Sequence, residues 1–197
     1  MSDAPRLVVA DTSVAINLNA TGCAVAILGA LPYDVSVTDV VQGELREDRR
    51  SGRRDAALLA ALVDAGHIRI VSLDESALRL FGELVAGSAA ETLDDGEAST
   101  IAYAVAHDAV PAIDERKARR ICAERFAAVR PLSTADILAE PVVEAALGRE
   151  TLGDAVFSAL RTARMRVPPE RVAWVVALIG AERASQCPSL PRHVRPG

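Results

Sequence analysis

Carboxylates are the side chains of this chain whose positions most clearly suggest chemistry. Asp11 and Asp114 each come directly after a short apolar run that is typical of a buried strand. In an open parallel sheet, ligands bind in the crevice beyond the carboxyl ends of the strands. Two aspartates at that edge therefore predict a functional site.

Two glutamates lie on the apolar stripes of predicted helices. Glu44 comes three residues after Val41, and Glu97 comes four residues before Ile101. Residues at these spacings share one helix face, and a fully solvated glutamate would avoid an apolar face. Four carboxylates are therefore expected to point towards the interior.

Carboxylates that are brought together inside a protein need a counter-charge. In a medium of lower dielectric, neighbouring anions repel one another by roughly several kcal/mol. Carboxylate oxygens are hard ligands that suit Mg²⁺ or Mn²⁺, and magnesium keeps several waters and binds substrate phosphate. This chemistry suits the hydrolysis of a phosphodiester.

Each carboxylate also has a simpler structural interpretation. The two strand-end aspartates could be helix caps, and Glu44 could pair with a nearby arginine. Acidic residues in the first turn of a helix also complement the helix dipole, and three of them occur close together here: Asp94, Asp95 and Glu97. The order and placement of the acids, taken jointly, favour a shared site.

Four sequence blocks of this chain resemble those of PIN-domain proteins. They are VVADTSVAINL, VVQGELRED, LDDGEASTIAYA and PAIDERKARR, and the resemblance covers roughly residues 7–140. The chain looks most similar to the VapC-like branch, because the third block has a GEA-type helix start and the fourth has an Asp followed by a basic helix. The resemblance implies metal ligands at Asp11, Glu44, Glu97 and Asp114.

The same resemblance implies an activity. PIN-domain proteins of this kind cleave single-stranded RNA with Mg²⁺ or Mn²⁺, and many are toxins held by an antitoxin protein. The third acid remains ambiguous, because Asp94, Asp95 and Glu97 lie within one turn; Glu97 is preferred for its stripe, and Asp95 is the second choice. A catalytically silent PIN-like module that binds RNA or protein is the alternative.

Polar and basic neighbours of the acids could bind substrate. Thr12 and Ser13 could hydrogen-bond a ligand carboxylate or a phosphate, although capping would serve equally well. A basic helix follows Asp114 and could hold the RNA backbone, although a solvated face is an equal alternative. Its candidate residues are Arg116, Lys117, Arg119 and Arg120.

The elements that must position these residues alternate between strand and helix. Strands are expected over 7–10, 34–38, 68–71, 110–113 and 129–132, with helices between them. Capping-box spacing at Ser72–Glu75 and at Ser133–Asp136 predicts two of the helix starts. The pattern predicts an α/β fold with a parallel sheet, which the resemblance specifies as a PIN-like three-layer α/β/α domain.

Composition limits the other classes of function. The chain has 197 residues, a net charge of −5 and 3% aromatic residues, so aromatic stacking on bases is not expected to dominate binding. The three cysteines lack the spacing of a zinc site or a disulfide framework. No signal peptide or membrane span is recognisable, which predicts a cytoplasmic protein.

The expected organisation has three parts. Residues 1–140 form the PIN-like nuclease domain, 141–185 a C-terminal helical extension and 186–197 a flexible tail. The stretch 14–31 is apolar and uncharged, which predicts cover by a partner, either a second copy of the chain in a homodimer or an antitoxin helix. The alternative is that the C-terminal helix containing Val172 and Val175 covers it.

Overall fold

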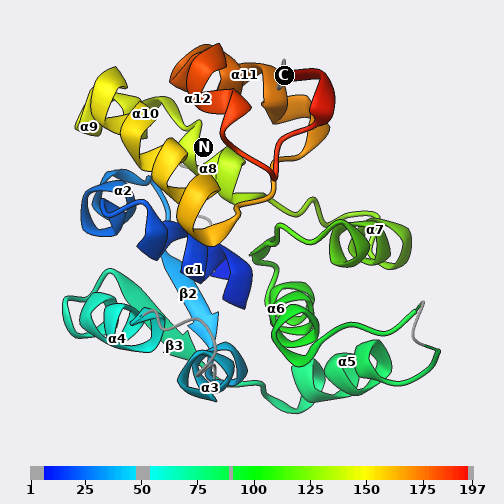
Figure 1. Cartoon of the computed structure of the whole chain (residues 1–197). Coiled ribbons are helices and arrows are strands. Elements are labelled where there is room, and N and C mark those ends of the chain that lie inside the picture. Colours follow the sequence, from blue (N-terminus) through cyan, green and yellow to red (C-terminus); the bar gives the residue numbers. More distant parts are fainter. Residues whose placement is uncertain (1–6, 48–53, 89–90, 195–197) are drawn as a thin grey trace, which may run out of the picture. The chain divides into compact units, whose positions relative to one another are not determined.

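The computed structural model describes residues 7–47, 54–88 and 91–194 (Figure 1). These residues form two compact units. The first takes its described residues from Met1–Ala15 and Pro32–Leu132, and the second takes them from Ile16–Leu31 and Ser133–Gly197. Helix α1 (Thr12–Ala20) begins in the first unit and continues in the second.

The first unit is built on a parallel sheet. Within the described residues it has four strands in the order β3-β2-β1-β4, namely β1 (Val8–Ala10), β2 (Val35–Thr38), β3 (Ile68–Val71) and β4 (Val110–Ala112). Strands β1 and β2 are buried along their whole length, as expected of strands covered on both faces. The strand expected over 129–132 reduces to a single parallel bridge between Leu132 and Ala112.

Helices cover this sheet. They are α3 (Asp39–Glu47), α4 (Asp55–Asp64), α5 (Glu75–Val85), α6 (Asp95–Ala106) and α7 (Arg116–Arg125). Helix α6 packs on β1, β2 and β4, whereas α3 and α4 pack near β2 and β3, and α5 lies along α6 (Figure 1). A core that includes Leu84, Ile101 and Ile113 fills the space between the α5–α6 pair and α7. The expected three-layer α/β/α fold is confirmed.

The strand order reverses direction at one point of the sheet, between β1 and β4. From β1 the chain moves outwards to β2 and β3 on one side, and then returns to place β4 on the other side of β1. The direction of winding therefore reverses between β1 and β4, and open α/β sheets bind ligands at such a switch point. Asp11 and Asp114 follow these two strands.

The second unit is helical. It contains the end of α1 together with α2 (Ala24–Ala30), α8 (Thr134–Leu138), α9 (Pro141–Leu147), α10 (Arg149–Ser158), the π-helical η1 (Ala159–Ala163), α11 (Pro169–Ile179), α12 (Ala181–Ser185) and the 3₁₀ turn η2 (Arg192–Val194). The C-terminal helices share one unit with residues 16–31.

The apolar stretch 14–31 forms two helices with a turn at Gly22, whose φ of 71° is accessible to glycine without strain. Helix α2 packs against α9, and Ser158 Oγ donates to the Ala20 carbonyl at 2.7 Å. Part of the cover is thus intramolecular and comes from α9, which lies in the predicted helical extension but is not the helix with Val172 and Val175 that the alternative named. The homodimer stays a prediction.

No single described helix is long and apolar enough to cross a membrane. The α1–α2 pair passes by length and composition only when the two helices are taken together, and it is bent by 113°.

The segment that was predicted to be a flexible tail has buried side chains at two positions. Cys187 and Leu190 are 0% and 2% exposed, and the Leu190 N–H donates to the Cys187 carbonyl at 3.1 Å. Two apolar side chains spaced by three residues are enough to pack this polar segment onto its unit.

Only one of the two predicted capping boxes forms. Ser133 accepts a hydrogen bond from the Asp136 N–H, and Asp136 accepts one from the Ser133 N–H. Helix α5, in contrast, begins at Glu75 and is capped by Asp74, whose carboxylate accepts from the Ala77 N–H. The box predicted at Ser72 is therefore wrong, because Asp74 is an equally good cap and lies one residue before the helix.

This difference gives the first prediction. Ser133→Ala should lower the free energy of unfolding by about 1 kcal/mol, because it leaves a buried helix N-terminus without its cap. Ser72→Ala, at an exposed position, should change it by less than about 0.5 kcal/mol. Urea unfolding of both variants measures the two values, and equal losses would contradict the assigned caps.

Candidate metal-binding site

Asp11 lies at the end of β1 and is 2% exposed. Its N–H continues the strand pairing by donating to the Ala112 carbonyl at 3.0 Å. Its carboxylate accepts from the Val14 N–H at 2.7 Å and from Ser13 Oγ at 2.9 and 3.0 Å. Asp11 therefore caps the first turn of α1, and the structural interpretation of this residue holds alongside any functional one.

The surroundings of Asp11 oppose its negative charge. Burial raises the pKa of Asp11 well above its ordinary value, and the neighbouring charges of Asp114 and, more weakly, Glu97 raise it further. The hydrogen bonds from Val14 and Ser13 act in the opposite direction and are outweighed. Three of the predicted acids thus share one electrostatic environment.

Asp114 and Glu97 reach this environment from different elements. Asp114 follows β4 and is 6% exposed. Glu97 lies in the first turn of α6, where burial and the charge of Asp94 raise its pKa to about 7, while a hydrogen bond from the Asp94 backbone lowers it. The side chain of Asp95 is exposed. Of the two candidates for the third acid, Glu97 is half-buried and its charge contributes to the raised pKa of Asp11. The choice of Glu97 over Asp95 stays a prediction.

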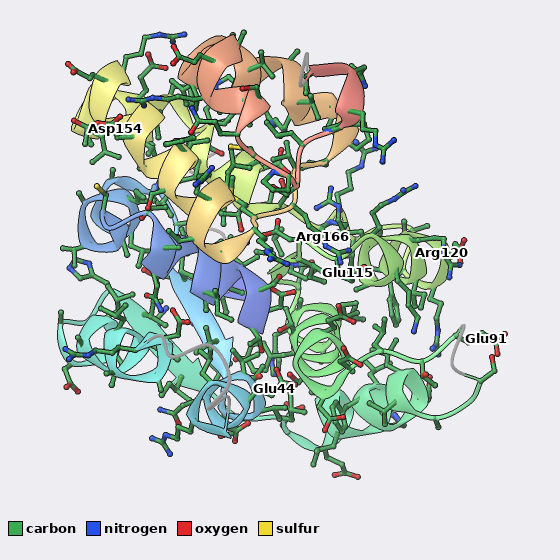
Figure 2. The ribbon with its side chains drawn as sticks, in the orientation of Figure 1. Glu44, Glu91, Glu115, Arg120, Asp154 and Arg166 are labelled. Atoms are coloured by element: carbon green, nitrogen blue, oxygen red, sulfur yellow. The ribbon has the colours of Figure 1, made fainter. Side chains whose placement is uncertain are left out.

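Glu44 is held differently from the other three acids. It projects from α3 on the side that faces α6 (Figure 2). One carboxylate oxygen accepts from the Thr12 hydroxyl, and the other accepts from the Gly96 N–H at 2.8 Å. Thr12 and Ser13, which were expected to contact a ligand carboxylate or a phosphate, here bond the carboxylates of Glu44 and Asp11.

Sequence reasoning missed Gly96. A Cβ at this position would lie 2.7 Å from Thr12 Oγ1 and inside the contact distance of the Glu44 carboxylate. The available signal was a glycine inside the first turn of a helix, where glycine is less favourable than almost any other residue.

The four acids are of the right chemical type to bind a divalent cation, but their side chains are not close enough together to do so in this structure. In the part of the chain that the structure describes, no three His, Cys, Asp or Glu side chains lie close enough together to hold a metal ion. The groups that donate hydrogen bonds to Asp11, the Ser13 hydroxyl and the Val14 N–H, are neutral. If Asp11 is ionised beside Asp114 and Glu97, a cation would therefore stabilise the group of acids. Carboxylate oxygens are the ligands that Mg²⁺ and Mn²⁺ prefer.

The basic helix α7 is partly engaged within the protein. Arg119 Nη1 donates to the Ile113 carbonyl at 3.1 Å, and Arg120, labelled in Figure 2, pairs with Glu124 at 2.7 Å. Arg116 is exposed, and the charge of Lys117 lowers the pKa of Glu97. Lys117 is thus one of the predicted substrate-binding residues, and its charge acts on Glu97.

The pKa shifts predict how stability depends on pH. A carboxyl group whose pKa is raised by folding binds its proton more tightly in the folded chain, so its stabilising effect is complete below the unfolded-state pKa and is lost as the pH rises through the folded-state pKa. For Glu97 this window runs from 4.5 to about 7. Without metal, Glu97→Gln should therefore become more stable relative to the wild type as the pH rises through this window.

Urea unfolding in the presence of a chelator measures this difference at each pH. Asp64→Asn, which changes an exposed carboxylate on α4, serves as the control and should follow the wild type. A constant difference between Glu97→Gln and the wild type would contradict the burial of Glu97.

Comparison with protein families places the chain. The sequence model of a family described as PIN domain matches residues 7–181, which includes most of the segment expected to be an extension. No curated protein and no solved structure matches the chain. Because the family match covers far more than half of the sequence, the chain belongs to the PIN-domain family.

Proposed function

We propose that this PIN-domain protein is a Mg²⁺- or Mn²⁺-dependent endoribonuclease that hydrolyses single-stranded RNA. PIN domains commonly are nucleases and generally use divalent metal ions. The observation that carries the proposal is the buried Asp11 carboxylate at the switch point of the sheet, whose pKa the charges of Asp114 and Glu97 raise.

Asp11, Glu44, Glu97 and Asp114 are the proposed metal ligands. A bound divalent cation lowers the pKa of a coordinated water and stabilises negative charge on the phosphodiester. Within the protein, Ser13 and the Val14 N–H orient Asp11, and the Thr12 hydroxyl and the Gly96 N–H orient Glu44.

The basic residues of α7 have a proposed role in binding the RNA backbone. The exposed Arg116 and the adjacent Lys117 are suited to contact phosphates, whereas Arg119 and Arg120 would have to share or exchange their protein contacts. Attack by water, in place of the 2′-hydroxyl, would leave 5′-phosphate and 3′-hydroxyl ends.

A VapC-like toxin role is the finer form of the proposal. It rests on the four sequence blocks, and its proposed partners are an antitoxin protein and a second copy of the chain. Support comes from α2 and α9, which pack together yet leave Val25 and Val142 at 55% and 40% exposure. Exposed apolar side chains on neighbouring helices suit an apolar partner.

One observation favours the catalytically silent alternative. Among the described residues the acids do not gather at metal-binding distances, and Glu44 already has two protein donors. A PIN-like module that only binds RNA or protein would require no closer approach. Metal binding by the isolated protein distinguishes the two functions.

We expect millimolar Mn²⁺ to raise the melting temperature. A cation that relieves repulsion among folded-state carboxylates binds only the folded chain, and at about 100 times its dissociation constant it would add about 2.7 kcal/mol, or roughly 5–10 °C. Differential scanning fluorimetry with Mn²⁺, and with Ca²⁺ for comparison, measures the shift. An unchanged melting temperature would support the silent alternative.

Asp11→Asn and Asp114→Asn should each reduce Mn²⁺-dependent RNA cleavage by about 1000-fold. The amide keeps the shape but removes the charge, and several kcal/mol of transition-state stabilisation correspond to about three orders of magnitude. Asp64→Asn on α4 is the matched control and should cleave like the wild type. Cleavage of a fluorescent RNA and end-group analysis are the measurements, and near-wild-type rates in either variant would refute the assignment.

A further inference from the structure

The two donors to Glu44 are sequence neighbours of two other acids. Thr12 follows Asp11 directly, and Gly96 precedes Glu97 directly. The hydrogen bonds from the Thr12 hydroxyl and the Gly96 N–H therefore join the Glu44 carboxylate, on α3, to the starts of α1 and α6. One side chain thus connects three of the four segments that carry acids.

The absence of a side chain at Gly96 makes the space for this arrangement. A methyl group there would overlap the Glu44 carboxylate and would lie 2.7 Å from the Thr12 hydroxyl oxygen. Since the end of a glutamate side chain can move more easily than two packed helices, the carboxylate would be displaced while the fold remained.

The carbonyl of Gly96 is also tied towards α3. Ser99 Oγ donates to the Gly96 carbonyl at 3.0 Å. The same Ser99 Oγ lies 2.8 Å from Thr38 Oγ1, and Thr38 Oγ1 accepts a hydrogen bond from the Val41 N–H of α3. Because the Ser99 proton is directed at Gly96, Thr38 donates to Ser99. Thr38 and Ser99 are fully buried, so this relay has little freedom to rearrange.

We infer that Gly96 and Thr12 are positioning residues that form a clamp on Glu44 and set its distance from Asp11 and Glu97. The effect of the clamp on metal binding rests on the proposed function, whereas the clamp itself does not. A carboxylate offers about four acceptor positions, so Glu44 retains two after bonding both donors. The clamp therefore orients Glu44 and leaves it able to bind a cation.

The test compares two pairs of variants. Gly96→Ala should displace Glu44, whereas Gly82→Ala, on α5 with no atom within 4 Å of the added Cβ, is the matched control. Thr12→Val removes the hydroxyl donor, and Thr12→Ser restores it. Circular dichroism and thermal unfolding without metal establish that each variant is folded.

The first measurement needs no metal. In protein labelled with ¹³C, the side-chain carboxyl resonance of Glu44, assigned by its loss in Glu44→Gln, should shift in Gly96→Ala and Thr12→Val. It should stay at its wild-type position in Gly82→Ala and close to it in Thr12→Ser. An unshifted resonance in Gly96→Ala would overturn the clamp whether or not the protein binds a metal.

The second measurement is Mn²⁺ affinity by isothermal titration calorimetry. Loss of an orienting partner typically weakens metal binding about 10- to 100-fold, and this range is expected for Gly96→Ala and Thr12→Val but not for Gly82→Ala or Thr12→Ser. Equal affinity in the wild type and Gly96→Ala would refute the positioning role. If the wild type bound no Mn²⁺, the proposed function would fail, while the carboxyl resonance would still decide the existence of the clamp.

Discussion

The burial of an ionisable carboxyl group at the end of β1 is the constraint on which the rest of the first unit depends. Asp11 is almost inaccessible to water, yet Asp114 and Glu97 are close enough to raise its pKa. Hydrogen bonds from Ser13 and Val14 offset only part of this cost. An arrangement that opposes its own ionisation makes a poor stabilising element, and its placement at the switch point of the sheet gives it a functional explanation.

The structure also determines how far apart the acids of the site lie. The strand order fixes Asp11 beside the end of β4, because the two strands are paired from Val8 with Val110 to Ala10 with Ala112. Glu44 and Glu97 come from helices, which pack less rigidly than paired strands. Hydrogen bonds hold α3 and α6 in place relative to each other, and they involve Thr12, Gly96, Ser99 and Thr38.

The sequence was informative where the signal is local. Local patterns predicted the four strands of the sheet, although the strand predicted over 129–132 is only a bridge, and the ends of the first and fourth strands predicted Asp11 and Asp114 as site residues. The contact of Glu44 with Gly96 joins residues 52 apart in the chain, and no periodicity reports such a pair. For the same reason, the sequence did not predict which helices make up the second unit. The apolar pattern of 16–31 indicates that the segment packs against something, but not that α9 is one of the helices it packs against.

The acidic character of the chain also fits a site of this kind. The chain has a net charge of −5, and part of its basic helix α7 makes contacts within the protein: Arg119 donates to the Ile113 carbonyl, and Arg120 pairs with Glu124. A net negative charge weakens the attraction of a polyanion to the protein. Under the proposed function, RNA phosphate and the acids repel one another unless a cation lies between them. The affinities for metal and for RNA must then increase each other, because coupling between two bound ligands is reciprocal. Under the proposed function, the net negative charge of the chain is thus a reason for RNA binding to depend on metal.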